Sequence, residues 1–142
     1  MSAIPSHIID FIQSHHIVSF ATHTHEDFWV ANCFYAFDIA NNQLIILSSK
    51  KTRHSRLMQQ NPHIVGTIST QTETLSDIEG IQFSAKAYCL ENELEKEKAL
   101  HIYYQRHPIA RLKPSDVWVL RFEMIKHTSN KVLFAQKTIW EK

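Results

Sequence analysis

Glycine is scarce in this sequence, because only Gly66 and Gly80 occur among the 142 residues. A P-loop and a dinucleotide-binding turn each need several glycines, which let the backbone approach a phosphate closely. Neither motif can be built from two glycines. Any phosphate group must therefore be held by side chains and by the start of a helix.

Cysteines and long hydrophobic runs are also few. Cys33 and Cys89 are isolated thiols without a CxxC pair, so nothing in the sequence indicates a disulfide scaffold. The apolar runs are too short to span a bilayer, and residues 1–5 do not resemble a signal peptide. We expect a cytoplasmic protein with no membrane partner.

A strong excess of one charge is absent as well, since the formal net charge is +1 with histidine neutral. Nucleic-acid-binding domains usually carry a marked basic surface, and this balance gives no global sign of one. The sequence is 44% hydrophobic and 20% charged, which is typical of a globular chain and not of a disordered one. We expect a single domain over residues 1–142 and no nucleic-acid partner.

Hydrophobic patterning predicts mostly β-structure. Strands are expected over residues 17–21, 28–37, 44–47, 64–68, 81–89, 117–125 and 132–140, with a polar loop over residues 69–80. The pattern in residues 81–89 alternates strictly, which predicts a strand with one buried and one wet face. Strands joined by turns outnumber the helices, and this favours an antiparallel barrel or sandwich with peripheral helices.

Three helices are expected. The first covers residues 5–15, and a short second helix ends at Asn61-Pro62. The third runs from Asn92 to about residue 106, because Asn92 and Glu95 have the spacing of a capping box. Its apolar side is expected to contain Leu94, Ala99, Ile102 and Tyr103.

The most unusual charge pattern lies in residues 48–56, where Lys50, Lys51, Arg53, His54 and Arg56 fall within seven residues. Thr52 is suited to cap the short helix that follows. The cations then oppose the helix dipole, and no Asp or Glu occurs from residue 39 to residue 72. A bound anion would relieve this conflict. The alternative is a solvated basic face, which charge runs usually form.

The remaining reactive residues form no recognisable catalytic or metal motif. The pairs His15-His16 and His23/His25 lack a third ligand, so we expect no structural metal. There is no GxSxG motif and no evident acid–base pair. If the protein performs chemistry, we expect a cofactor to supply it.

One segment order resembles a known family. A strand, residues 48–54, a short helix, Asn61-Pro62 and a further strand follow one another as in the FMN-binding split barrels related to pyridoxamine 5′-phosphate oxidase. More closely, the whole chain is similar to the bacterial YhbP-like family in the segments Ala31-Asn32, Lys51–His54, Gly80–Phe83, Pro108–Arg111 and Ile139-Trp140. This resemblance implies a mainly β fold with peripheral helices, namely an antiparallel split β-barrel.

The resemblance also implies FMN as the cofactor, bound at the interface of a homodimer. Residues 52–54 would hold the phosphate, Gln82 would reach the ring or the ribityl chain, and Trp118 would come from the partner subunit. Asn32 stands where the oxidase has an arginine, and His54 where it has a lysine. The implied cofactor-binding residues are Asn32, Cys33, Phe34, Leu47, Ser48, Lys51, Thr52, Arg53, His54, Gln82 and Trp118.

Three functions remain open. The first is a flavin-dependent oxidoreductase that binds FMN and acts on an unknown substrate. The second is a non-catalytic binding protein for flavin, haem or another anionic cofactor. The third is a phosphate- or nucleic-acid-binding module that uses the basic stretch alone. RNA recognition favours aromatics interleaved with the cations, and none lies between Lys50 and Arg56.

Overall fold

The computed structural model describes residues 3–130 and 136–142. The helices and strands follow in the order α1 (Ser6–Gln13), β1 (Ile17–His23), β2 (Phe28–Phe34), β3 (Ala36–Asp38), β4 (Gln43–Leu47), α2 (Arg53–Gln60), β5 (His63–Ser69), β6 (Glu79–Cys89), α3 (Glu93–Arg106), β7 (Val117–Ser129) and β8 (Gln136–Glu141). Short 3-10 helices occur at Ile39–Asn41, Leu75–Asp77 and Pro108–Leu112. None of the helices described is long and apolar enough to cross a membrane.

The strands form one curled antiparallel sheet. Its order is β2-β1-β5-β6-β7-β4-β3, and β8 pairs with the far half of β7. The two ends of this order, β2 and β3, are consecutive in the chain, so the sheet bends back on itself. The expected antiparallel split β-barrel is therefore confirmed.

The bend occurs at Tyr35, where a single strand over residues 28–37 was expected. Instead, β2 pairs with β1 and β3 pairs with β4. Tyr35 is fully buried, its hydroxyl donates to the Ile12 carbonyl at 2.6 Å, and its amide donates to the His16 carbonyl at 2.9 Å. These bonds to the end of α1 and the residues after it hold the chain where it leaves one strand partner for the other.

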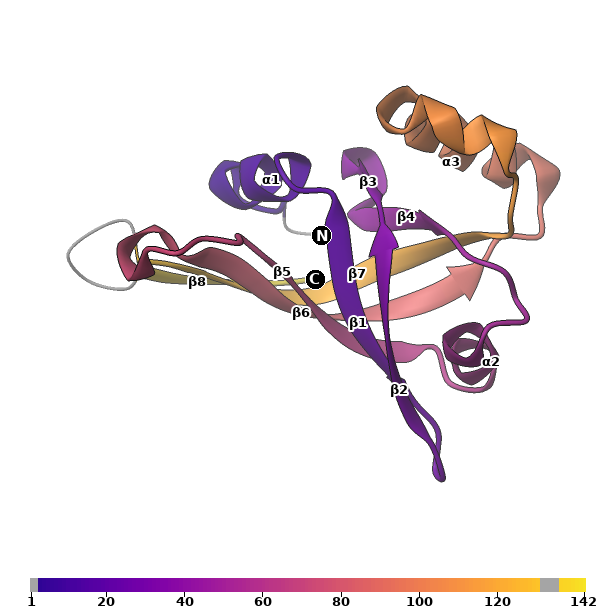
Figure 1. The fold of residues 1–142 in the computed structure, drawn as a ribbon, viewed down its shortest axis with the longest axis horizontal. Coiled ribbons are helices and arrows are strands. Elements are labelled where there is room, and N and C mark those ends of the chain that lie inside the picture. The colour runs from indigo at the N-terminus through magenta and orange to yellow at the C-terminus, as the bar shows by residue number, and fades with distance from the viewer. Residues whose placement is uncertain (1–2, 131–135) are drawn as a thin grey trace.

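The core fills the inside of the curled sheet. Ile8, Phe11 and Ile12 of α1 are buried in this core. On the opposite face of β3, β4 and the start of β7, Ala99 and Tyr103 of α3 form a second, smaller core with Ala36, Ile45, Val117 and Val119 (Figure 1). In contrast, α2 stands beside the β1–β2 hairpin, which projects away from the rest of the molecule (Figure 1). Among the described residues, this arrangement leaves the outer face of β1, β2, β5 and the second half of β7 without a covering helix.

Most sequence expectations for individual elements hold. The alternation in residues 81–89 is confirmed, with the odd positions on the inner side. Asn92 caps α3, because its Oδ1 accepts from the Glu95 amide at 3.0 Å. Leu94 was wrongly assigned to the buried side of α3, because its side chain is 60% exposed. Of the expected strand over residues 132–140, residues 132–135 lie outside the described part.

Candidate functional site

The junction between β4 and α2 carries the basic stretch, and β7 fixes it in place. The Ser48 amide donates to the Asp116 carbonyl at 2.9 Å, and the Trp118 indole Nε1 donates to the Ser48 carbonyl at 3.1 Å. Trp118 is 1% exposed, so it is a core residue that supports this turn. In the single chain its ring is closed off, and the expectation that the partner's Trp118 contacts the cofactor stays a prediction.

Thr52 caps α2 as the sequence predicted. Its Oγ1 accepts from the Ser55 amide at 3.2 Å and lies 2.8 Å from the Ser55 hydroxyl, which is fully buried. The Thr52 hydroxyl also donates to the Ser49 carbonyl at 3.0 Å. Thr52 thus joins the turn to the first turn of the helix, and its side chain is already engaged in the free protein.

His54 points back toward the turn. Its Nε2 lies 2.7 Å from the Ser48 hydroxyl and 3.2 Å from Thr52 Oγ1, and its ring contacts Phe20 edge-on. Burial lowers the pKa of His54 below its ordinary value, because the charged imidazolium loses hydration. The ring is therefore neutral at pH 7 and adds no positive charge to the start of α2.

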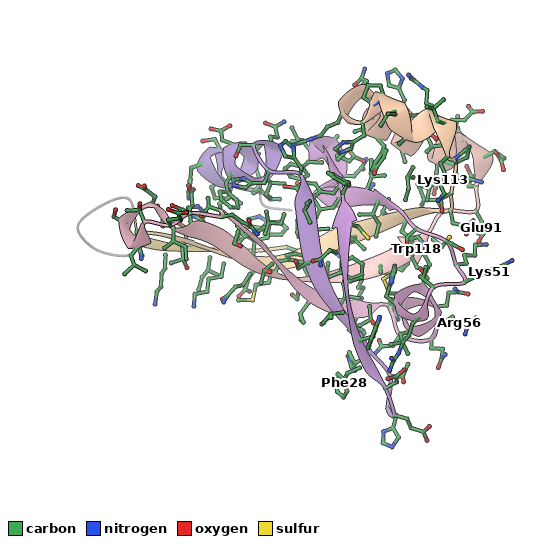
Figure 2. All side chains as sticks on the ribbon, in the orientation of Figure 1. Phe28, Lys51, Arg56, Glu91, Lys113 and Trp118 are labelled. Atoms are coloured by element: carbon green, nitrogen blue, oxygen red, sulfur yellow. The ribbon has the colours of Figure 1, made fainter. Side chains whose placement is uncertain are left out.

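The cations of the basic stretch are partly compensated by acids from distant segments. Arg53 is paired with Asp27 at 2.6 Å, and Lys50 with Glu91 at 2.6 Å. The sequence argument from the absence of nearby acids is thus corrected, because folding brings these two carboxylates to the helix start. Among the residues described, Lys51 and Arg56 have no ion pair, and both point outward in Figure 2.

Two backbone amides at the start of α2 are available to an anion. In the part of the chain that the structure describes, the amides of Arg53 and His54 donate to no protein acceptor. The next two amides, those of Ser55 and Arg56, donate to Thr52. Free amides, the positive end of the helix dipole and the exposed Arg53 and Lys51 together form a donor set that suits a phosphate group.

A second group of the expected site residues lies on the outer face of the sheet. Asn32 is registered against Ser19, Ser19 against Thr67, Thr67 against Gln82, and Gln82 against Lys126. Directly paired residues share a face, so these five side chains form one polar row across five strands. They line an open groove of about 690 Å³ whose other lining residues are mainly apolar.

Sequence reasoning named Asn32 and Gln82 but missed the other three members of this row. The alternation in each strand shows which residues point outward, but it does not show the register between strands. Gly66 is part of the same groove. A Cβ at this position would lie 2.5 Å from the Ser19 carbonyl oxygen and 2.5 Å from Phe83 Cζ, so only glycine allows this packing.

The remaining expected residues lie on both faces of the sheet and in a second hollow. Phe34 is 57% exposed on the outer face, whereas Cys33 points inward, and its burial raises the thiol pKa to about 11. Leu47 and Ser48 line a separate hollow of about 820 Å³ beside Tyr103 and Lys113. Among the described residues, no group of three or more His, Cys, Asp or Glu side chains could hold a metal.

A single chain therefore does not bring all the expected residues together. Arg53 contacts Trp29 and Asp27 on β2 and its turn, while Asn32 and Gln82 lie in the outer groove. Trp29 and Asn32 are three positions apart on one strand, so their side chains point to opposite faces. The helix start and the groove are two half-sites of different chemistry, because the first offers cations and free amides and the second is mainly apolar.

Comparison with known proteins assigns the chain to a family. No family model matches the sequence. The UPF0306 protein of Haemophilus ducreyi is 55% identical over 143 residues, covering 100% of this chain and 98% of that protein. The chain belongs to the UPF0306 family. Two other UPF0306 proteins are similar to it. YE0465 of Yersinia enterocolitica is 37% identical over 95% of this chain and 91% of the relative. YhbP of Salmonella paratyphi B is 35% identical over 92% of this chain and 88% of the relative.

Solved structures share the fold of this UPF0306 chain at low identity. A heme-binding protein from Mycobacterium smegmatis has a TM-score of 0.70 at 18% identity over 88% of this chain, which spans about half (53%) of that protein. A FAD-binding protein from Mesorhizobium loti has a TM-score of 0.71 at 10% identity, and the match covers 89% of this chain and 94% of that protein. HutZ, the heme storage protein of Vibrio cholerae, has a TM-score of 0.62 at 17% identity, and the match covers 86% of this chain and 92% of that protein. These likenesses show a common split-barrel fold.

Proposed function

We propose that this UPF0306 protein binds FMN, with the phosphate at the start of α2 and the ring in an outer-face groove. The observation that carries the proposal is the donor set at the helix start, where the exposed Arg53 adjoins the free amides of Arg53 and His54. The name of the Mesorhizobium loti neighbour, a FAD-binding protein, supports a flavin. Lys51 would add a second positive charge.

The residues present fit FMN in chemistry. The phosphate meets cations and amides without a glycine-rich loop, as the composition requires. The groove offers an apolar surface for a flavin ring and the side-chain amides of Asn32 and Gln82 for its polar edge. A bound flavin would supply one- or two-electron transfer. The protein's own residues would bind and orient the cofactor, since no acid–base pair is evident at either half-site.

We also propose that the functional unit is a homodimer formed through the outer sheet face. This face exposes seven large apolar side chains, namely Ile17, Phe28, Val30, Phe34, Val65, Met124 and Ile139. Contiguous apolar surfaces of this kind mark interaction sites. The proposal requires that a second copy place its own helix start near the first copy's groove, so that two half-sites from different chains meet around one cofactor.

The dimer is tested by charging the centre of this face. Val65 is 57% exposed between Ala21 and Ser84, so Val65→Glu would place a carboxylate in the proposed interface. Ile109→Glu is the matched control, because Ile109 is 78% exposed on a distant 3-10 helix. Light scattering should show a dimer for the wild type and for Ile109→Glu, and a monomer for Val65→Glu. A monomeric wild type at micromolar concentration would refute the proposal.

A titration of FMN and riboflavin tests the phosphate site. Arg53→Ala removes a charge-assisted hydrogen bond to the phosphate, so FMN binding should weaken by about 10-fold or more. Riboflavin, which lacks the phosphate, should bind equally well to both proteins. Arg56→Ala is the control, because Arg56 is an exposed cation on the same helix whose amide is already bonded. Equal losses for the two flavins, or for the two arginine variants, would contradict the site.

The second candidate is a non-catalytic binding protein for flavin, haem or another anionic cofactor. It is supported by the names of the Mycobacterium smegmatis and Vibrio cholerae neighbours, which refer to heme. The absorbance spectrum of the freshly purified protein shows whether flavin, haem or neither is bound, because flavin and haem absorb at different wavelengths. Oxidoreductase activity on an unknown substrate is then tested by whether the bound flavin is reduced by a donor and reoxidised in turnover.

A further inference from the structure

The β1–β2 hairpin holds α2 at both of its ends. At the start of the helix, the hairpin residues Asp27 and Trp29 contact Arg53. At its end, the Asn61 side-chain amide lies 3.2 Å from His23 Nε2. The hairpin projects from the sheet beside α2 in Figure 1, and a bond from the Thr24 amide to the Asp27 carbonyl closes its tip. The hairpin thus fixes the position of the Arg53 side chain at the start of α2.

The Arg53 guanidinium is occupied on one face and on one edge. The Trp29 ring lies 3.9 Å from Arg53 Cζ, so it covers one face. Along one edge, Arg53 Nη2 donates to Asp27 Oδ1 at 2.6 Å and Nε donates to Oδ2 at 3.2 Å. A planar guanidinium binds phosphate through the same paired donors that it offers to a carboxylate. Asp27 therefore occupies an edge through which Arg53 would bind a phosphate.

The pair is well formed but open to solvent. The hydrogen bond from Arg53 lowers the pKa of Asp27, so its carboxylate is ionised at neutral pH. The side chains are 50% and 38% exposed, and exposed ion pairs contribute little and are weakened by salt. A phosphate monoester carries a charge of about −1.5 to −2 at pH 7, compared with −1 for a carboxylate. A phosphate can therefore replace Asp27, and a simple monocarboxylate gains nothing by doing so.

We propose that Asp27 is an internal competing anion, which holds Arg53 in the free protein and is displaced when a dianionic phosphate group binds. Asp27 thereby sets both the affinity and the selectivity of this site. This inference rests on the proposed phosphate site at the start of α2. It adds to that site a residue from another element that opposes binding instead of supporting it.

The test compares Asp27→Asn with Glu26→Gln, which removes a neighbouring exposed carboxylate that makes no contact with Arg53 among the described residues. Both variants lower the negative charge of the hairpin tip by one, so their difference isolates the direct contact. Asp27→Asn should tighten FMN binding about 2- to 5-fold relative to Glu26→Gln, as expected from the loss of an exposed ion pair. Riboflavin binding should not separate the two variants, and the melting temperature of Asp27→Asn should lie only about 1–3 °C below that of Glu26→Gln, because the lost ion pair is exposed.

The outcomes distinguish this inference from the proposed function. If Arg53→Ala leaves FMN binding unchanged, the phosphate site itself is wrong. If Arg53→Ala weakens FMN binding but Asp27→Asn binds no tighter than Glu26→Gln, the site stands and the competition is refuted. If Asp27→Asn weakens FMN binding as Arg53→Ala does, Asp27 instead positions Arg53 for the ligand. A gain for Asp27→Asn that shrinks as salt is added supports the competition.

Discussion

The Thr52 cap gives a prediction that can be worked out bond by bond. In Thr52→Ala, the Ser55 amide loses its acceptor, which typically costs about 1 kcal/mol for an N-cap. The fully buried Ser55 hydroxyl loses its contact at 2.8 Å as well, which adds about 0.5–1.5 kcal/mol. The free energy of unfolding should therefore fall by about 1.5–2.5 kcal/mol. At about 3 °C per kcal/mol for a domain of this size, the melting temperature should fall by about 5–8 °C.

Thr52→Ser is the matched control, because serine retains the hydroxyl and loses only a methyl group. Urea denaturation of the wild type and the two variants should place Thr52→Ser close to the wild type and Thr52→Ala well below it. If both variants lose the same stability, the methyl group and not the cap stabilises the turn. If neither loses any, the start of α2 does not depend on the hydrogen bonds at Thr52, and the reasoning fails.

Two further predictions concern His54 and Gly66. The pKa of His54 is lower in the folded state than in the unfolded state. The stability that its neutral ring contributes is therefore complete above about pH 6.5 and is lost as the pH falls through the folded-state pKa. The difference in urea midpoint between the wild type and His54→Gln should shrink between pH 7.5 and 5.5, and a constant difference would contradict this. Gly66→Ala should destabilise by about 1–3 kcal/mol, because the new methyl group would meet the Ser19 carbonyl oxygen at 2.5 Å. Gly80→Ala should lose less stability, because its methyl group would lie 3.1 Å from the nearest atom, the Ile68 carbonyl oxygen. Thermal unfolding of the two variants checks this order.

Features that depend on neighbours in the chain could be predicted from the sequence. The cap at Thr52 and the cap at Asn92 each join residues three positions apart, so their chemistry is visible in a short segment. The alternation in residues 81–89 identified the buried face of β6 for the same reason. The split-barrel fold was identified through family resemblance, and the family and fold were then supported by the comparisons.

The charge state of the candidate site was decided by the tertiary structure. Asp27 lies 26 residues before Arg53, and Glu91 lies 41 residues after Lys50, so no local pattern could reveal either ion pair. Trp118 has the alternation of a strand, but only the packing of β7 beneath the β4–α2 turn shows that its ring is buried and supports this turn. Hydrogen bonds within a turn depend on a few adjacent torsion angles, whereas ion pairs and burial depend on which distant strands become neighbours.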